Sequence, residues 1–292
     1  MASWYDHPHY FDLVFRDETE AEVAFFKQAF QRFASGEVRR VLEPGCGSGR
    51  LVVAMAAEGF DVTGLDLSQP MLDYMQKRLQ EEGLNATSVI GDMKAMDFEH
   101  KFDAAFCTFN TFRHMLSKKD AVAHLRSVAE NLRPGGIYIL GFHMIPMDAD
   151  PNCTERWKAK DENFKVKAKL KVMDFNRDTR IENLRVTIKA KNKAGEVERV
   201  TSEFPLRIYT PKQAKKLFRK VSDVFEIAEA YDFDYDIDEE RDFDNDLTDA
   251  VFVLRRLEES PSVEPVESES TNDLLEADSQ GSHPDPAEPQ SV

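Results

Sequence analysis

A glycine-rich loop is the part of this sequence whose residue types and spacing most directly indicate chemistry. Residues Glu43–Arg50 read EPGCGSGR, with glycines at positions 45, 47 and 49. Glycines at this spacing permit a tight turn and let a ligand approach the backbone closely. Asp66 lies 17 positions beyond Gly49, and a carboxylate there can accept hydrogen bonds from both hydroxyls of a ribose. The loop and the acid together predict a site for a nucleoside-containing cofactor.

Two other nucleotide-binding loops fit the sequence less well. Dinucleotide-binding dehydrogenases favour the spacing G-x-G-x-x-G, whereas the spacing here is G-x-G-x-G and position 50 is arginine. A P-loop needs a lysine followed by a serine or threonine after its last glycine, and neither follows Gly49. A glycine turn in some other α/β protein remains the structural alternative.

Alternating strand and helix patterns surround this loop. Strands are predicted over residues 38–43, 60–67, 87–90, 102–109 and 137–142, and helices over 19–34, 51–58, from 68 onward, and 118–132. Thr19 and Glu22 predict a capping box for the first of these helices, and Ser68 predicts a cap for the third. A late hairpin, 224–231 with 250–254, would complete the sheet. The pattern predicts an α/β fold with a doubly wound, mostly parallel, seven-stranded sheet.

A different pattern of apolar and polar residues follows the fifth predicted strand. Apolar and polar residues alternate over 164–172, 184–190 and 200–208, which predicts three strands of an antiparallel meander inserted into the core. Its polar face includes lysines at 165, 167, 169 and 171, which we interpret as a solvated face, with an anionic substrate as the alternative. The predicted domains are an N-terminal cap segment and helix (1–37), the cofactor-binding core (38–150), the antiparallel β insertion (151–209), the C-terminal part of the core (210–257) and a disordered acidic tail (258–292).

Five ordered motifs between residues 38 and 142 resemble those of class I S-adenosylmethionine-dependent methyltransferases. They are the glycine loop at 43–49, Asp66, Gly91-Asp92-Met93, the fourth strand with Thr108-Phe109-Asn110, and the turn Leu132-Arg133-Pro134-Gly135-Gly136. The resemblance implies that S-adenosylmethionine is the cofactor and S-adenosylhomocysteine the product. It covers about a third of the chain and says little about the methyl acceptor.

The resemblance also implies which residues bind the cofactor. The aromatic-rich amino-terminal segment is similar to one that folds over the cofactor in such enzymes, and an aromatic face favours a sulfonium cation. We choose Tyr10 from this segment, although ordinary packing of the segment is an equal alternative. The complete predicted set is Tyr10, Glu43, Gly45, Cys46, Gly47, Gly49, Asp66, Leu67, Gly91, Asp92, Met93, Thr108 and Phe109.

Two histidines are candidates for a catalytic base. His114 follows the fourth predicted strand and His143 the fifth, and such strand ends face the ligand in open α/β sheets. An imidazole can accept a proton near neutral pH if the nucleophile must lose one. We rank His143 above His114, with a surface or structural role as the alternative for each.

Composition and charge limit the partners. The chain has 292 residues and a net charge of −16, which disfavours DNA or RNA as substrate. No long apolar run predicts a membrane span, so no membrane partner is expected. Three sparsely spaced cysteines favour a reducing, cytoplasmic location over a disulfide framework or zinc site. The acidic segment from Asp232 to Asp238 fits no EF-hand frame, so no metal site is predicted.

The sequence therefore predicts a methyltransferase that acts on a small-molecule nitrogen or oxygen nucleophile. The insertion would cover the acceptor or form a homodimer contact. A protein methyltransferase and a catalytically inactive binding protein remain alternatives.

Overall fold

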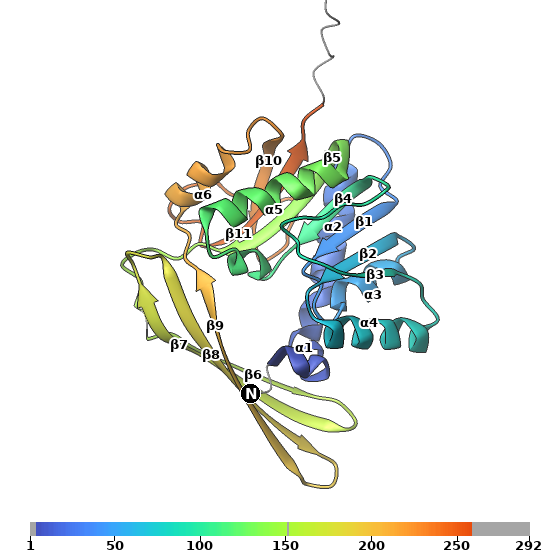
Figure 1. Cartoon of the computed structure of the whole chain (residues 1–292), viewed down its shortest axis with the longest axis vertical. Coiled ribbons are helices and arrows are strands. Elements are labelled where there is room, and N and C mark those ends of the chain that lie inside the picture. The colour runs from blue at the N-terminus through green and yellow to red at the C-terminus, as the bar shows by residue number, and fades with distance from the viewer. Residues whose placement is uncertain (1–3, 151, 259–292) are drawn as a thin grey trace, which may run out of the picture. The chain divides into compact units, whose positions relative to one another are not determined.

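The computed structural model describes residues 4–150 and 152–258. Its core is one sheet with the strand order β10-β11-β5-β4-β1-β2-β3 (Figure 1). The strands are β1 (Arg40–Pro44), β2 (Asp61–Asp66), β3 (Thr87–Ile90), β4 (Phe102–Cys107), β5 (Leu132–His143), β10 (Phe225–Asp232) and β11 (Asp249–Arg256). Strands β1 to β5 run parallel to one another. Strand β11 runs antiparallel to β5, and β10 runs antiparallel to β11. The predicted seven-stranded, doubly wound sheet is confirmed.

Helices cover both faces of this sheet. Buried side chains of α2 (Thr19–Phe33), α3 (Arg50–Ala57) and α4 (Gln69–Glu82) pack in one cluster, and those of α5 (Lys118–Asn131) and α6 (Pro211–Phe218) pack in another on the opposite face. Ser68 caps α4, because its hydroxyl accepts a hydrogen bond from the Met71 amide. No helix within the described ranges is long and apolar enough to cross a bilayer.

The predicted capping box at the start of α2 is wrong. Glu18 occupies the cap position, and no side chain caps the helix there. Glu22 is fully buried and forms an ion pair with Arg50 of α3, while Thr19 accepts a hydrogen bond from the same guanidinium. The acid that resembled a cap therefore holds two helices together.

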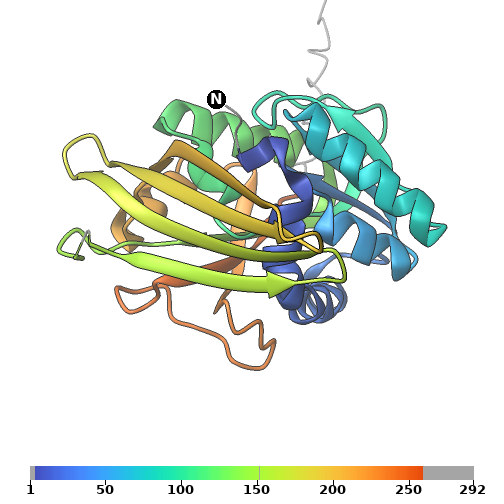
Figure 2. The same cartoon turned by 90° about the horizontal axis from the view of Figure 1, so that it is seen from below.

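The insertion forms a separate antiparallel sheet, called sheet B here. Its order is β6 (Thr154–Lys160), β7 (Phe164–Asn176), β8 (Ile181–Asn192) and β9 (Val197–Arg207), so the predicted meander of three strands gains a fourth, β6. Val166, Val186 and Ile188 point inward and are almost fully buried. Figure 2, seen from below, shows this sheet in front of the core.

The amino-terminal segment packs against the inner face of sheet B. It comprises η1 (Trp4–Asp6), α1 (Pro8–Phe15) and η2 (Arg16–Glu18). Tyr10, Leu13 and Phe15 share one apolar cluster with the inward side chains of sheet B. The predicted acidic tail, apart from Glu258, lies outside the described residues.

Candidate active site

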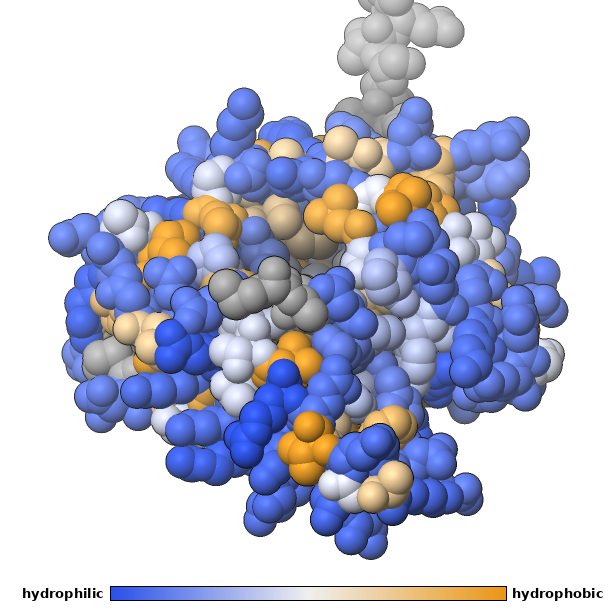
Figure 3. Space-filling view, turned by 60° about the horizontal axis from the view of Figure 1, so that its bottom comes forward, coloured by the Kyte–Doolittle hydropathy of each residue, from blue (hydrophilic) through white to orange (hydrophobic). Residues whose placement is uncertain are grey.

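A cavity of about 950 Å³ lies between the carboxyl edge of the main sheet and the inner face of sheet B. The strand ends, the amino-terminal segment and sheet B each contribute walls. Of the residues predicted from sequence, it brings together Gly45, Gly47, Asp66, Leu67, Gly91, Asp92, Met93, Phe109, His114 and His143. Figure 3 shows a largely hydrophilic surface around this region, with apolar residues only in small groups.

The glycine loop shapes one end of the cavity. Gly45 and Gly47 have φ values of +75° and +53°, a region that favours glycine. A Cβ at Gly45 would lie 2.5 Å from the side chain of Thr111, so a larger residue would not fit. The backbone of the loop is therefore not covered by side chains where it faces the cavity.

Asp66 is held rigidly beside this loop. One carboxylate oxygen accepts a 2.8 Å hydrogen bond from the Gly47 amide, and the other accepts one of 2.8 Å from the Ser68 amide. Burial raises the pKa of Asp66, and these backbone donors oppose that shift. Each oxygen keeps lone pairs for a further donor. The acid is therefore positioned to accept hydroxyl groups of a ligand.

The third strand end supplies a neighbouring wall. Asp92 accepts a 3.0 Å hydrogen bond from the Lys94 amide and lies 3.3 Å from the Lys94 ammonium. The carbonyl of Met93 is 3.0 Å from Nδ1 of His124, whose Nε2 is 2.7 Å from the Tyr138 hydroxyl. Burial lowers the pKa of His124 to about 4, so the ring is neutral and its Nδ1–H donates to the carbonyl. His124 thus supports the wall from behind.

The segment after β4 carries backbone strain. Phe109 and Asn110 have φ values of +59° and +71°, unusual for residues other than glycine. The Asn110 side-chain oxygen accepts hydrogen bonds from the His143 amide (3.0 Å) and from a guanidinium nitrogen of Arg113 (3.3 Å). Such strain persists only where surrounding contacts fix it, and it often marks functional sites.

His143 and His114 differ in their surroundings. Nδ1 of His143 is hydrogen bonded to the Asp249 carboxylate, its cross-strand partner on β11, and this bond lowers the pKa of Asp249. Nε2 of His114 lies 3.1 Å from the Tyr5 hydroxyl. Burial, with a smaller contribution from Arg113, lowers the pKa of His114 to about 4. His114 is therefore poorly suited to accept a proton near neutral pH, whereas Asp249 orients the ring of His143.

A buried ion pair joins sheet B to the strand end beside these histidines. Arg113, in η3 (Thr111–His114), contacts Glu182 of β8 and also donates a 2.8 Å hydrogen bond to the Arg207 carbonyl. The two side chains are only 3% and 4% exposed. Burial lowers the pKa of Arg113, while Glu182 opposes that shift.

Five predicted cofactor residues do not line the cavity, namely Tyr10, Glu43, Cys46, Gly49 and Thr108. The Tyr10 hydroxyl donates a 2.6 Å hydrogen bond to Glu198, and the Thr108 hydroxyl donates one of 2.8 Å to Glu22. Glu43 is buried behind the loop, and burial raises its pKa well above the usual range. The amino-terminal segment does reach the cavity, but through Tyr5, Phe11 and Phe15.

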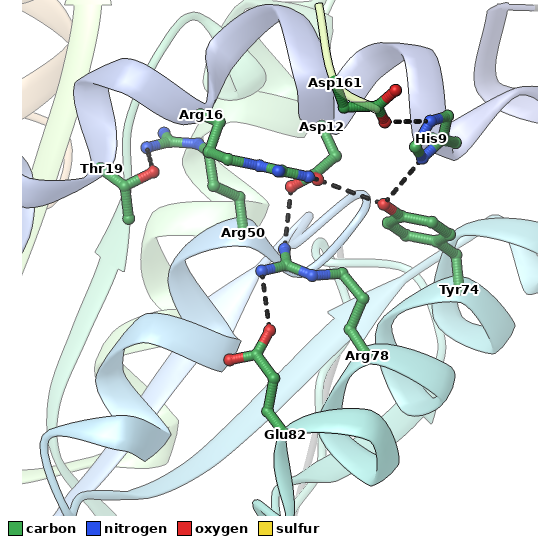
Figure 4. Close-up of polar contacts among 9 residues, drawn as sticks. All are labelled: His9, Asp12, Arg16, Thr19, Arg50, Tyr74, Arg78, Glu82 and Asp161. Atoms are coloured by element: carbon green, nitrogen blue, oxygen red, sulfur yellow. Dashed lines mark hydrogen bonds and ion pairs between the residues drawn. The ribbon is translucent and has the colours of Figure 1, made fainter. Parts of the chain in front are cut away.

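A cluster of charged side chains fixes this amino-terminal segment (Figure 4). Asp12 is fully buried on α1 and forms ion pairs with Arg16 and with Arg78 of α4. The Tyr74 hydroxyl donates a 3.1 Å hydrogen bond to the same carboxylate. His9 lies 3.0 Å from Asp161, between β6 and β7. The segment is thus tied to both the main core and sheet B.

Sequence reasoning missed several cavity residues, including Arg113, Glu182 and Asp249. Arg113 and Glu182 are 69 positions apart, and His143 and Asp249 are 106 apart. Pairing of β5 with β11 brings His143 and Asp249 together, and packing of η3 against sheet B brings Arg113 and Glu182 together. Phe11 and Phe15, in contrast, share one face of α1 at helical spacing, so their common direction could have been read from the sequence.

Known proteins resemble the core and the whole fold to different extents. Residues 41–136 match a family model described as a methyltransferase domain. A cypemycin N-terminal methyltransferase from a Streptomyces species is 35% identical over 102 residues, which are 35% of this chain and 41% of that protein. A dTDP-3-amino-3,4,6-trideoxy-alpha-D-glucopyranose N,N-dimethyltransferase from Streptomyces venezuelae is 29% identical over 137 residues, 46% of this chain and 56% of that protein. The chain thus matches about half the length of these curated relatives.

The structural likeness extends further than the sequence likeness. The crystal structure of Streptomyces venezuelae DesVI has a TM-score of 0.69 and 18% sequence identity, and the match covers 85% of this chain and 97% of that chain. At this identity the likeness concerns the fold. The structural match covers 85% of the chain, whereas the family model matches only residues 41–136.

Proposed function

We propose that this chain, which carries a class I methyltransferase domain, transfers the methyl group of S-adenosylmethionine to a nitrogen or oxygen nucleophile of a small molecule by in-line displacement. The observation that carries this proposal is one continuous cavity that runs from Asp66 and the glycine loop to the inner face of sheet B. Its volume of about 950 Å³ lies at the upper end of the usual range for small-ligand pockets. One cavity can therefore hold cofactor and acceptor together.

The residues present fit S-adenosylmethionine. A side chain at Gly45 would collide with Thr111, so the loop leaves its backbone open to the ligand. Asp66 retains lone pairs for ribose hydroxyls, and Met93 and the exposed side chain of Leu67 offer apolar surface for a purine. Phe11 and Phe15 add aromatic faces that suit a sulfonium. When bound, the cofactor supplies a methyl group that is already activated.

The other half of the cavity favours an amine acceptor. Asp150, Glu155 and Asp249 lie on its wall and are exposed, which makes the electrostatic potential there negative. Arg113, the cation on the same side, is already paired with Glu182. The relatives named above as N-terminal and N,N-dimethyl transferases also point to nitrogen. A cationic amine would be attracted to this end and must lose a proton before it can attack.

His143 is the proposed proton acceptor. With Nδ1–H donating to Asp249, the neutral ring presents Nε2 as its acceptor. Positioning and exclusion of water provide the remaining catalysis, because an in-line displacement needs little else from the protein. The proposed role for sheet B is thus to cover the acceptor.

Calorimetric titration with S-adenosylmethionine and S-adenosylhomocysteine tests the cofactor assignment. We expect Asp66→Asn to weaken both ligands at least tenfold, equivalent to about 1.4 kcal/mol. Asp61→Asn, at the exposed start of the same strand, is the matched control and should bind normally. Unchanged binding by Asp66→Asn would contradict the assignment.

A screen of primary amines, phenols and carboxylates tests the acceptor. His143→Gln should reduce turnover of the best amine about 10²- to 10⁴-fold without changing cofactor affinity. His100→Gln, on an exposed loop, is the control. Cofactor binding without turnover of any acceptor would favour an inactive binding protein, and turnover of proteins alone would favour a protein methyltransferase.

The cytoplasmic location also remains a proposal. Cys46 and Cys107 are buried free thiols, and Cys153 is a free thiol on the cavity wall. A reducing compartment suits this arrangement, since oxidation of Cys153 would alter the wall.

A further inference from the structure

The outer face of sheet B is an unusually basic surface. Ten exposed cations lie on it, from all four strands, namely Arg156, Lys158, Lys160, Lys165, Lys167, Lys169, Lys171, Lys189, Lys191 and Arg199. None of them takes part in an ion pair among the described residues. The full chain has a formal charge of −16, so the remainder without these ten carries −26.

The strand register places these cations directly opposite one another. Lys158, Lys167, Lys189 and Arg199 form one continuous row across the four strands. Lys160, Lys165 and Lys191 form a second row beside it. Like charges directly opposite on a sheet are destabilising. Glu203 also lies on this face and pairs with Arg185, but the two basic rows contain no acid, and this arrangement indicates an anionic partner.

A second copy of this chain does not fit the surface. A twofold dimer formed through this face would place each basic row against the same rows of its partner. Ten cations from each copy would then repel one another. The predicted homodimer contact, if it forms, must therefore use another surface.

The absence of aromatic residues from this face disfavours single-stranded nucleic acid. All four aromatic residues of these strands point inward: Trp157, Phe175 and Phe204 line the cavity, and Phe164 packs against Tyr10. Single-stranded nucleic acids are usually bound by stacking their bases on aromatic side chains. Eight of the ten cations are lysines, which act as point charges rather than as the bidentate forks of arginine. The surface suits a broad array of phosphates that is not read for sequence.

We propose that the outer face of sheet B docks the protein on an anionic phospholipid bilayer. The cations lie on one sheet, which matches a planar array of headgroups. The remainder of the described residues, acidic overall, lies mostly behind the sheet, where packed layers are about 10 Å apart. The Debye length at physiological salt is about 8 Å, so repulsion from that remainder is largely screened. This docking is peripheral and needs no membrane-spanning helix.

Vesicle flotation with the full chain tests this surface. We expect binding to vesicles that contain about 30% phosphatidylserine at about 0.1 M salt, no binding to phosphatidylcholine alone, and release at about 0.5 M salt. Absence of binding to the anionic vesicles would overturn the proposal. Binding of a DNA duplex that outcompetes these vesicles at the same salt would also overturn it, in favour of nucleic acid.

A triple variant separates binding from folding. Lys167→Glu, Lys169→Glu and Lys191→Glu each place an acid opposite a cation, namely Lys189, Arg156 and Lys165 in turn. The variant should therefore melt at the same or a higher temperature than the wild type. Loss of each cation alone weakens membrane binding about fivefold, and each new carboxylate adds repulsion, so we expect a loss of at least about 100-fold.

A matched control reverses three exposed lysines elsewhere, Lys119→Glu, Lys212→Glu and Lys216→Glu on α5 and α6. It makes the same change in net charge and should retain vesicle binding within about threefold. Equal losses in the two variants would show that net charge, and not this face, governs binding, and would overturn the proposal.

Discussion

Removal of the charge at Glu182 should destabilise the protein strongly. Arg113 and Glu182 are both almost completely buried, and each is the other's ion-pair partner. Glu182→Gln keeps the size of the side chain but leaves a buried guanidinium without a counter-ion. Breaking a buried pair in this way typically costs about 3–5 kcal/mol. We expect a loss near the lower end, because Arg113 retains its bonds to Arg207 and Asn110.

The loss of stability in Glu182→Gln should come from the unpaired charge of Arg113. Removal of both charges should therefore restore much of the lost free energy of unfolding. Arg113→Met combined with Glu182→Leu leaves no buried ion, and such apolar replacements are often close to neutral. The double variant still loses the hydrogen bond to the Arg207 carbonyl, which costs about 1–3 kcal/mol. It should therefore be more stable than Glu182→Gln alone.

An exposed ion pair on the same sheet provides the control. Arg185 of β8 pairs with Glu203 of β9, and their side chains are 43% and 53% exposed. Glu203→Gln should change stability by less than about 1 kcal/mol. Urea denaturation at neutral pH, followed by tryptophan fluorescence, gives all four values. Equal stability of Glu182→Gln and Glu203→Gln would refute the argument that burial sets the cost.

Further variants test the glycine loop, a buried histidine and the ion pairs that hold the amino-terminal segment. Gly49→Ala should lower the free energy of unfolding by about 2–4 kcal/mol, because φ at this position is positive and the new Cβ would lie 2.1 Å from Met75. Gly83→Ala is the control, because its Cβ would meet open space and should cost only about 1 kcal/mol. Urea denaturation measures both values. His124 has a folded pKa of about 4, below its unfolded value near 6.5, so it favours folding above pH 6.5 and loses that contribution as the pH falls toward 4. The stability difference between wild type and His124→Gln should therefore shrink by up to about 1.4 kcal/mol per pH unit across that window, and a constant difference would show that the ring does not titrate in this way. Asp12→Asn should raise the Kd for S-adenosylmethionine in calorimetry, since α1 loses its ion pairs to the core; an unchanged Kd would show that the segment covers the cavity without this restraint.

The sequence allowed the core to be predicted because local signals and global topology agree there. Strand patterns, the glycine loop and the cap at Ser68 each depend on nearby residues, and the structure reproduces most predicted elements to within a few residues. Strand β5 is an exception, because it begins at Leu132 and includes the segment 132–136 that was predicted as a turn. The fourth strand of sheet B was missed because β6 contains Glu155 on its inner face. An acid that serves the cavity breaks the apolar alternation by which strands are recognised.

The half of the cavity proposed for the acceptor could not be predicted in the same way. Its key contacts join η3 to β8 and β5 to β11, and each depends on tertiary pairing that no spacing reveals. Tyr10 illustrates a different limit within a single helix, because helical spacing groups Phe11 with Phe15 but does not reveal which face meets the cavity. The amino-terminal segment was expected to cover the cavity, but the helical turn directs Phe11 and Phe15 into it and Tyr10 toward Glu198. Residue type alone could not distinguish these directions.

The strained segment after β4 connects the two halves of the cavity. Asn110 receives one hydrogen bond from Arg113, whose charge is held by sheet B, and another from the backbone of His143. Sheet B therefore helps to fix the backbone of this segment, in which Phe109 has the more unusual positive φ. A loss of the Glu182 charge should then affect turnover as well as stability. If methyl transfer depends on this segment, kcat should fall in Glu182→Gln even under conditions where the variant is fully folded.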